Sequence, residues 1–281
     1  MTIQTELMRA WRLVCCATIL GLAACTSPSG EPSPTPVAPA STTTLPPAGG
    51  RFSYQIGGAY PPDPSVRIVG RDHSVAPDRH RYSICYVNAF QGQAEDLGWW
   101  QAHHSDLLLH DGGKVVIDEN WGEPLLDIST ATKRAALMRI VGAWFDECAR
   151  RGYRAIEADN LDTYTRSNGL LTAADALAYG RLLVARAHRL HLALAQKNAS
   201  ELSRQAHRAG FDFAIAESCQ VYSECGAYTS VYGRHVIEIE YSDAPFAKAC
   251  KARGTRVSVV RRDVDVTQPG KPGHVERWCS H

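Results

Sequence analysis

The sequence predicts an α/β protein with a single-domain (β/α)8 TIM-barrel fold. Three observations lead to this prediction: eight short apolar segments are typical of strands, helical patterns separate most of them, and no Gly-x-Gly-x-x-Gly turn follows the first strand. Alternating strands and helices indicate a parallel sheet. Eight such units fit a closed barrel better than an open doubly wound sheet, and the missing glycine turn argues against a dinucleotide-binding domain.

The expected strands are short, and several end on polar residues. They are residues 52–57, 82–88, 107–118 with a break at Gly112 and Gly113, 155–159, 192–196, 213–217, 235–240 and 257–260. Two helices are clear between them. Residues 133–151 have apolar positions at helical spacing and stop at Gly152, and residues 172–190 begin with a capping box between Thr172 and Asp175.

The N-terminal segment has the pattern of a secretory signal. Arg9 and Arg12 precede an apolar run that is shorter than the ~18 residues of a membrane-spanning helix and ends in Leu22-Ala23-Ala24-Cys25. This ending resembles the bacterial lipobox, in which the cysteine is lipidated. We therefore expect residues 1–24 to be a lipoprotein signal peptide and Cys25 to be a lipid anchor; an ordinary cleaved signal with a chance cysteine is the alternative.

Residues 25–50 are rich in Ser, Thr and Pro and cannot bury enough apolar surface to fold, so they are expected to form an extended tether. Residues 51–281 would then be the folded domain. These assignments predict an exported cell-surface lipoprotein held at the bacterial membrane. The chain has 30 basic and 29 acidic residues, which gives no electrostatic reason to expect a nucleic acid partner.

Six cysteines remain after the signal segment, an even number that predicts disulfides in an exported protein. They are Cys85, Cys148, Cys219, Cys225, Cys250 and Cys279. A bridge between Cys219 and Cys225 is the easiest, because they flank a short loop. The other four allow three pairings, of which Cys250 with Cys279 and Cys85 with Cys148 is favoured. No Cys-x-x-Cys pair occurs, and His188 and His191 lack the Glu of a zincin helix, so no metal is expected. No cofactor is expected either.

Four expected strands bring polar side chains to their carboxyl ends, where barrel enzymes carry their reacting groups. The residues that end or follow the fourth, fifth, sixth and seventh strands are Asp159, Lys197, Glu217 and Glu240. Each acid taken alone could be a helix cap or a solvated loop residue, and Glu157 and Glu238 are better explained as structural ion pairs inside the barrel. Trp99, Trp100 and Trp121 either belong to the core or stack on sugar rings.

Several of these residues match short motifs of a known family. The matching stretches are Glu157 to Asp162, Lys197-Asn198, Glu217-Ser218-Cys219 with Tyr222 to Cys225, and Glu240-Tyr241. In content and order they resemble the endo-α-1,4-polygalactosaminidase family of glycoside hydrolases, and the resemblance extends from Phe52 to the last strand. The departures are Ala158 for Pro, Ala216 for Asn and Ser218 for Gln, which bear on the subsites more than on the chemistry.

The resemblance implies a TIM barrel with Asp159 and Glu217 as the catalytic pair and an α-1,4-linked galactosamine polymer as substrate. Two carboxyl groups are what glycoside cleavage needs. We expect Asp159 to be the nucleophile and Glu217 the acid/base, because Glu217 follows an apolar strand. The expected substrate-binding residues surround them: Asp118, Trp121, Asn160, Asp162, Lys197, Tyr222, Glu240 and Tyr241.

More acidic than basic residues are expected near the carboxyl ends of the strands, at the mouth of the barrel. This negative charge would attract a cationic amino-sugar polysaccharide. Two other functions remain open: a catalytically silent carbohydrate-binding lipoprotein of the cell surface, and a barrel glycosidase with a different α-galactoside specificity.

Overall fold

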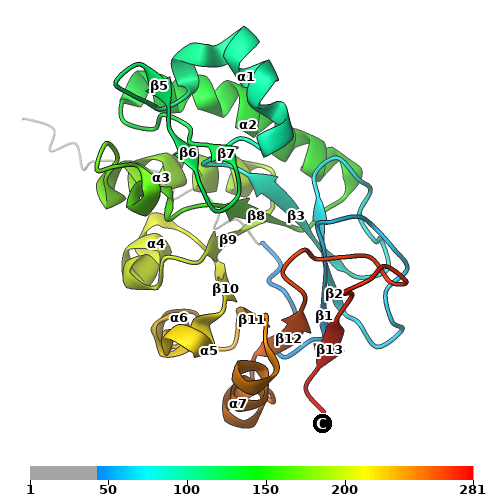
Figure 1. The fold of residues 1–281 in the computed structure, drawn as a ribbon. Helices are drawn as coiled ribbons and strands as arrows, with labels where there is room; N and C mark the ends of the chain where they lie inside the picture. Colours follow the sequence, from blue (N-terminus) through cyan, green and yellow to red (C-terminus); the bar gives the residue numbers. More distant parts are fainter. Residues whose placement is uncertain (1–42, 281) are drawn as a thin grey trace, which may run out of the picture. The chain divides into compact units, whose positions relative to one another are not determined.

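The computed structural model describes residues 43–280. Its centre is a nine-stranded sheet in the order β1-β2-β3-β8-β9-β10-β11-β12-β13 (Figure 1). Eight neighbouring strands are parallel, and β13 is antiparallel to β12. Their bounds are β1 Phe52–Gln55, β2 Ile68–Asp72, β3 Tyr82–Asn88, β8 Ala155–Asp159, β9 Ala193–Lys197, β10 Phe213–Glu217, β11 Val236–Glu240, β12 Ser258–Arg262 and β13 Glu276–Trp278.

Side chains join the two ends of this sheet. Trp278 Nε1 donates to the carbonyl oxygen of Phe52 at 2.8 Å, and Ser53 Oγ donates to Glu276 Oε1 at 2.7 Å. These contacts close the sheet into the TIM barrel that the sequence predicts.

The prediction of a barrel strand at residues 107–118 was wrong. This segment forms β4 (His110–Asp111), β5 (Lys114–Val115) and β6 (Ile117–Asp118), which lie outside the barrel sheet; β6 pairs with β7 (Glu123–Pro124). Gly112 and Gly113 have φ of 54° and 81°, so the chain reverses there into a hairpin.

The missing barrel strand is β2, which has only two apolar side chains and follows β1 without an intervening helix. Gly70 in β2 faces the interior. A Cβ there would lie 2.9 Å from Phe52 Cζ, so the glycine makes room for that ring.

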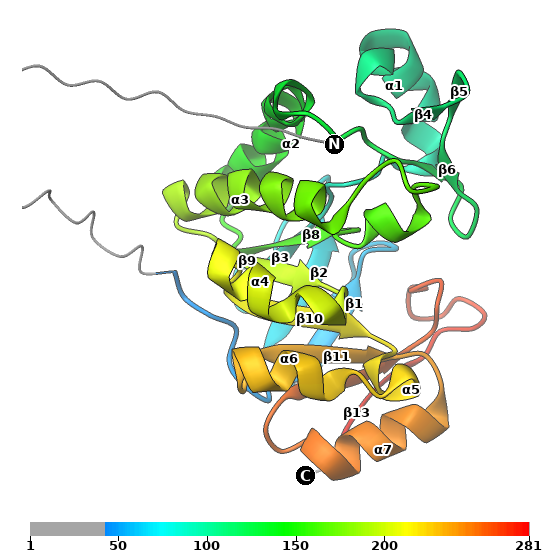
Figure 2. The ribbon, with the colours of Figure 1, turned by 90° about the vertical axis from the view of Figure 1, so that its left-hand side faces the viewer.

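Helices cover the barrel from β3 round to β12 (Figure 2). The two predicted helices are present: α2 begins after Thr130 and ends at Gly152 with φ 98°, and α3 has the capping box of Thr172 and Asp175. The helices are α1 Leu97–His104, α2 Ala131–Arg151, α3 Ala173–Arg189, α4 Ser203–Ala209, α5 Cys219–Tyr222, α6 Cys225–Tyr232 and α7 Asp243–Arg253.

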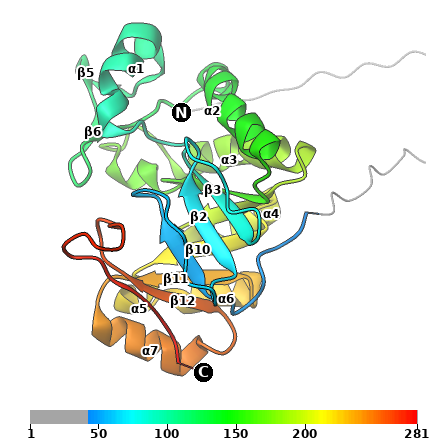
Figure 3. The same ribbon diagram turned by 90° about the vertical axis from the view of Figure 1, so that its right-hand side faces the viewer.

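No helix follows β1 or β2, and Figure 3 shows these strands with no helix in front of them. The helical shell is thus incomplete on the β1–β3 side. Among the described residues, no helix is long and apolar enough to cross a membrane.

Alternation along the strands divides the apolar residues into two clusters. One fills the barrel and includes Phe52, Ile84, Phe213 and Ile237, and the other lies between the sheet and the helices. Residues 43–50, expected to be the end of the tether, pack on the barrel instead. Leu45 contacts the interior cluster, and the carbonyl oxygen of Thr44 accepts a hydrogen bond from Tyr82. The signal peptide, Cys25 and the rest of the tether lie outside the described residues.

Three disulfides link the described chain with the pairing that the sequence favours. Cys85 pairs with Cys148, Cys219 with Cys225 and Cys250 with Cys279. The first connects β3 to α2, the second follows directly on β10, and the third holds the C-terminal end against α7.

Candidate active site

A cleft of about 850 Å³ opens at the carboxyl ends of the barrel strands. Its walls come from the ends of β1, β2, β3, β8, β9 and β10, from the loops that follow β1, β2, β3, β8, β9 and β12, from Tyr241 directly after β11, and from the β6–β7 hairpin. The predicted residues that line it are Asp118, Trp121, Asp159, Asn160, Asp162, Lys197, Glu217 and Tyr241.

Strand alternation aims three charged residues into this cleft. Asp159, Lys197 and Glu217 are the last residues of β8, β9 and β10, and each lies two positions after a residue of the barrel interior. The residue after each of them has a left-handed backbone: Asn160 at φ 69°, Asn198 at φ 52° and Ser218 at φ 53°. The chain therefore turns sharply away directly after each functional side chain.

Lys197 lies between the two candidate catalytic carboxylates. Its Nζ is 3.2 Å from Asp159 Oδ1 and 3.3 Å from Glu217 Oε2, and its side chain is 1% exposed. Burial opposes its charge, but the surrounding carboxylates outweigh this effect and hold the pKa of Lys197 well above its usual value. The ammonium group is therefore a fixed positive charge between the two acids.

This arrangement limits the separation of the acids. Both oxygens contact one nitrogen atom, so they are no more than about 6.5 Å apart. Retaining glycosidases hold their carboxyl groups about 5 to 5.5 Å apart, and inverting enzymes about 6.5 to 9.5 Å apart. The limit includes the retaining range and meets the inverting range only at its lower edge.

Glu217 is held from three directions. Tyr241 donates a short hydrogen bond to Oε1, Asn198 Nδ2 donates to Oε2 at 3.1 Å, and Asn198 Oδ1 accepts from the Glu217 backbone N–H at 2.9 Å. Burial raises the pKa of Tyr241 well above its usual value, and the charge of Glu217 adds to this shift, so the phenol stays protonated as a donor. Asn198 was not among the expected site residues, although it directly follows Lys197.

Asp159 has a different set of partners. Its Oδ1 accepts from the backbone N–H of Asn160 at 2.8 Å and also faces Lys197. Tyr86 lies beside it; burial raises the pKa of this tyrosine, and the charge of Asp159 raises it further. The two acids share one cation but differ in their other neighbours.

A second layer of polar groups lies beneath the pair. Glu157 is fully buried and accepts hydrogen bonds from Lys197 Nζ at 2.8 Å and from Tyr54 Oη at 2.8 Å. This is the expected ion pair inside the barrel. Burial raises the pKa of Glu157 to about 6, against the opposing effect of the Lys197 charge.

Arg166, which the sequence did not single out, contributes a second cation to the mouth. Its guanidinium pairs with Asp118 at 2.6 Å and with Asp162 at 2.9 Å, and it donates to Asn160 Oδ1 at 3.0 Å. Asp118 and Asp162 are therefore partly neutralised within the protein. The position of Arg166 in a loop after β8 gives no sequence pattern that would reveal it.

Glu123 is a further cleft residue that sequence reasoning missed. It lies on β7, and its Oε2 accepts from Asn160 Nδ2 at 3.3 Å, so it is next to the strand end that carries Asp159. Burial raises the pKa of Glu123 to about 7, and the negative charges of Asp159 and Asp118 add to the shift. The only available signal was its place in the loop with Asp118 and Trp121.

Two expected substrate-binding residues lie outside the cleft. Glu240 faces the helical side of β11, because Ile239 occupies the inward position, and it accepts from the backbone N–H of Gln220 at 2.8 Å. Tyr222 is 69% exposed on α5 and does not line the cleft. Glu238 also faces outward and pairs with Arg253 at 2.6 Å, so the ion pair expected for it inside the barrel lies on the helical side.

The three tryptophans have separate surroundings. Trp100 is buried in the core, Trp99 is exposed on α1 outside the cleft, and Trp121 is 60% exposed on the cleft wall. Only Trp121 is placed to contact a sugar in the cleft.

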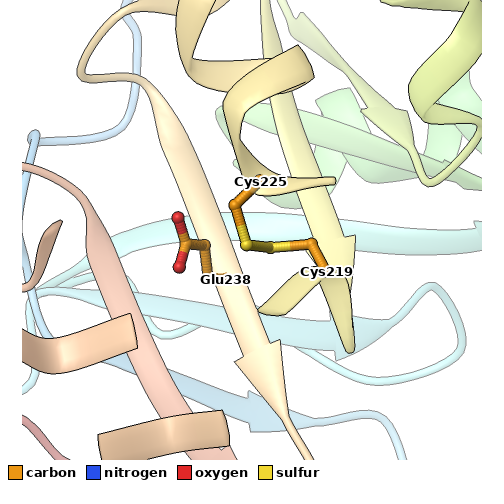
Figure 4. A group of neighbouring side chains, drawn as sticks. All are labelled: Cys219, Cys225 and Glu238. Carbon is orange, nitrogen blue, oxygen red and sulfur yellow. A yellow bond between two sulfur atoms is a disulfide. The ribbon is translucent and has the colours of Figure 1, made fainter. Parts of the chain in front are cut away.

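Within the described chain, one group of side chains has the spacing of a metal site: Cys219, Cys225 and Glu238 (Figure 4). Both sulfur atoms belong to the disulfide, and Glu238 is already paired with Arg253. Disulfide sulfurs are not thiolate ligands, so the group does not fit a metal ion.

Residues 32–281 match the model of glycoside-hydrolase family GH114. The chain belongs to family GH114. It is therefore a glycoside hydrolase. No curated protein sequence matches the chain significantly.

Solved structures show the same barrel as this GH114 chain. Ega3 of Aspergillus fumigatus, solved in complex with galactosamine, is 22% identical with a TM-score of 0.70, and the match covers 86% of this chain and 100% of that chain. The glycoside hydrolase domain of PelA from Pseudomonas aeruginosa is 15% identical with a TM-score of 0.52, covering 79% and 96%.

Proposed function

We propose that this GH114 protein hydrolyses an α-1,4-linked, galactosamine-containing polysaccharide, with Asp159 and Glu217 as its catalytic residues. The observation that carries the proposal is the pair of cleft carboxylates, each within 3.3 Å of the single ammonium group of Lys197. Two carboxyl groups at this spacing are what glycoside hydrolysis needs. The likeness to a structure that holds galactosamine supports the choice of sugar.

In the proposed reaction, Asp159 attacks the anomeric carbon while Glu217 protonates the departing glycosidic oxygen. Glu217 then removes a proton from water, which hydrolyses the glycosyl-enzyme. Lys197 Nζ and the Asn160 backbone N–H both contact Asp159 Oδ1 and orient this carboxylate. Tyr241 and Asn198 orient Glu217, which is the more exposed of the two acids and so has room to meet the leaving oxygen.

Other cleft residues would bind the polymer. Trp121 offers an exposed ring for stacking, and Asp118, Asn160 and Asp162 form the network around Arg166. No role in binding is proposed for Glu240 or Tyr222, because neither lines the cleft.

The test is hydrolysis of defined polysaccharides by the wild type, Asp159→Asn and Glu217→Gln. We expect the wild type to release reducing ends from α-1,4-galactosamine polymer, and each variant to lose several orders of magnitude in kcat while keeping its melting temperature. Binding without cleavage by the wild type would instead support a silent carbohydrate-binding protein. Cleavage of neutral α-galactosides alone would support a different glycosidase specificity.

The stereochemistry of the first product tests the assigned roles. Proton NMR during the first minutes should show the α-anomer, because the short separation of the acids favours retention. Initial release of the β-anomer would contradict Asp159 as nucleophile and leave both acids in an inverting mechanism.

We also propose that the protein is exported and held at the bacterial membrane through a lipid on Cys25. Support comes from Leu22-Ala23-Ala24-Cys25 and from the three disulfides, which are typical of oxidising compartments. Detergent partitioning of the full chain from a bacterial host should place the wild type in the detergent phase and Cys25→Ser in the aqueous phase. Equal aqueous partitioning of both would contradict the anchor.

A further inference from the structure

Glu123 differs from the other carboxylates close to the candidate catalytic pair. Asp159 and Glu217 face Lys197, and Asp118 and Asp162 pair with Arg166. Glu123 forms no ion pair with any cation of residues 43–280, and the side chains that donate to it, Asn160 and Asn88, are neutral amides. It is therefore a partly buried acid whose counter-charge the described chain does not supply.

Glu123 is placed near the 2-amino group of the sugar whose anomeric carbon Asp159 would attack. It shares Asn160 with the strand end that carries Asp159, because Asn160 donates its backbone N–H to Asp159 and its side-chain amide to Glu123. If Asp159 attacks the anomeric carbon, the substituent on the neighbouring ring carbon lies close to Asp159. In a 2-amino sugar that substituent is the amine.

We propose that Glu123 binds the ammonium group of the amino sugar at the cleavage site and selects for sugars with a free amine. This inference rests on the proposed function and assigns a specificity-determining residue within it. The ammonium group supplies the missing counter-charge, and an N-acetyl group cannot, because an amide is uncharged and larger.

Asn88 is a second polar group beside Glu123, and its Oδ1 accepts a hydrogen bond from Asn160 Nδ2 at 2.9 Å. Asn88 ends β3 opposite Asp159 and is 5% exposed, yet its Nδ2 makes no hydrogen bond of normal geometry with the described residues. Burial raises the pKa of Glu123, and the Asn88 side chain, as a hydrogen-bond donor toward this carboxyl group, lowers it. An acid without a counter-charge next to an amide donor matches a sugar that presents an ammonium group next to a hydroxyl oxygen.

The titration of Glu123 gives the proposal a pH signature. Burial raises its pKa to about 7, with Asp159 and Asp118 as the negative charges that face it; Arg166 and Lys197 are paired with other acids. Glu123 gains its charge as the pH rises through about 7. Affinity for the amino polymer should therefore increase over this range, up to the pH at which the sugar amines lose their protons.

The test compares Glu123→Gln with Glu95→Gln, an equal change of charge at an exposed position of the same cleft. The substrates are α-1,4-galactosamine polymer and its fully N-acetylated form. Glu123→Gln should lower kcat/KM on the amino polymer by about tenfold to a hundredfold, mainly through KM, and leave the N-acetylated polymer unaffected or cut faster. The rise of kcat/KM near pH 7 should disappear in this variant and persist in Glu95→Gln.

Three outcomes separate the possibilities. An equal loss on both polymers would show that Glu123 acts in positioning or folding and would overturn the inference, as would wild-type kinetics and pH dependence in Glu123→Gln. In both cases the proposed function stands, because the wild type still cuts the amino polymer. If the wild type cuts neither polymer, the proposed function fails and the inference fails with it.

Discussion

Lys197 donates a hydrogen bond to Glu157 at 2.8 Å in a part of the barrel that solvent does not reach. Glu157 lies two residues before Asp159 on β8 and on the same face of the strand, so the pair is one layer deeper than the proposed nucleophile. The buried carboxylate holds the lysine in place, and the lysine then presents its charge to both candidate catalytic acids. An ion pair of the barrel interior thereby positions the groups at its mouth.

Replacing the buried lysine should damage both stability and activity. Lys197→Met leaves Glu157 buried without its cation, and removing one member of a buried ion pair costs about 3–5 kcal/mol. We expect this loss in the free energy of unfolding by urea, together with a fall in kcat of at least two orders of magnitude. The kcat falls because Asp159 and Glu217 then repel each other without the charge between them.

The double variant Lys197→Met/Glu157→Gln separates the two effects. It removes both buried charges, so most of the stability should return while the activity stays low. Full activity in either variant would show that Lys197 has no part in positioning the acids.

The strand order shows what the sequence could not reveal. The prediction depended on apolar runs, and residues 107–118 are more apolar than β2. β2 belongs to the barrel because β1 and β3 hydrogen-bond to it on both sides, which is a long-range property. The alternation of strands with helices was the other local signal, and it is missing here because no helix precedes or follows β2.

Site residues at the ends of strands could be predicted from the sequence, and site residues in loops could not. Asp159 and Glu217 each end a short strand that the sequence predicts, and the structure places both in the cleft. Glu240 also ends a strand, but its alternation with the inward Ile239 already places it on the other face. Arg166 and Glu123 come from loops, whose course no periodicity describes.

The disulfide next to Glu217 should affect catalysis more than its short loop suggests. Cys219 is the first residue of α5 and follows Glu217 by two residues, and Cys225 is the first residue of α6. Replacing both with Ser should lower the melting temperature and lower kcat several-fold, because the turn after β10 loses a covalent restraint. The control Cys250→Ser/Cys279→Ser removes the C-terminal bridge and should lower stability alone. Unchanged kcat in the first variant would contradict the role of this bridge.

An ion pair between a histidine and an aspartate outside the cleft should make the free energy of unfolding depend on pH. His188 on α3 lies 2.8 Å from Asp212 Oδ2, and this hydrogen bond raises the pKa of His188. Because the folded-state pKa lies above that of the unfolded chain, the stabilisation is fully present below about pH 6.5 and is lost as the pH rises through the folded value. For a partly exposed pair it is about 1 kcal/mol or less.

Urea unfolding at pH 5.5 and pH 8.5 measures this contribution. The difference in stability between wild type and Asp212→Asn should be larger at pH 5.5. Asp212 also accepts a hydrogen bond from the backbone N–H of Leu194 at 2.8 Å. Weakening this bond destabilises Asp212→Asn equally at both pH values, so it does not contribute to the difference between them. His188→Gln retains that acceptor and should lose the pH-dependent part. Equal differences at both pH values would contradict the assignment.

The charge of the cleft leads to the last prediction, which concerns salt. Two cationic side chains, Arg166 and Lys197, oppose a larger number of acids that line the same cleft: Asp72, Glu95, Asp96, Asp118, Glu123, Asp159, Asp162, Glu217 and Asp265. This excess attracts a cationic polymer, and the attraction is screened over about 8 Å at physiological ionic strength and about 3 Å at 1 M. We therefore expect kcat/KM for the galactosamine polymer to fall as sodium chloride is raised, with little change in kcat. The N-acetylated polymer is the control, because it is uncharged and any rate on it should not depend on salt. An equal response of both polymers would show that the acids of the cleft do not select the substrate by its charge.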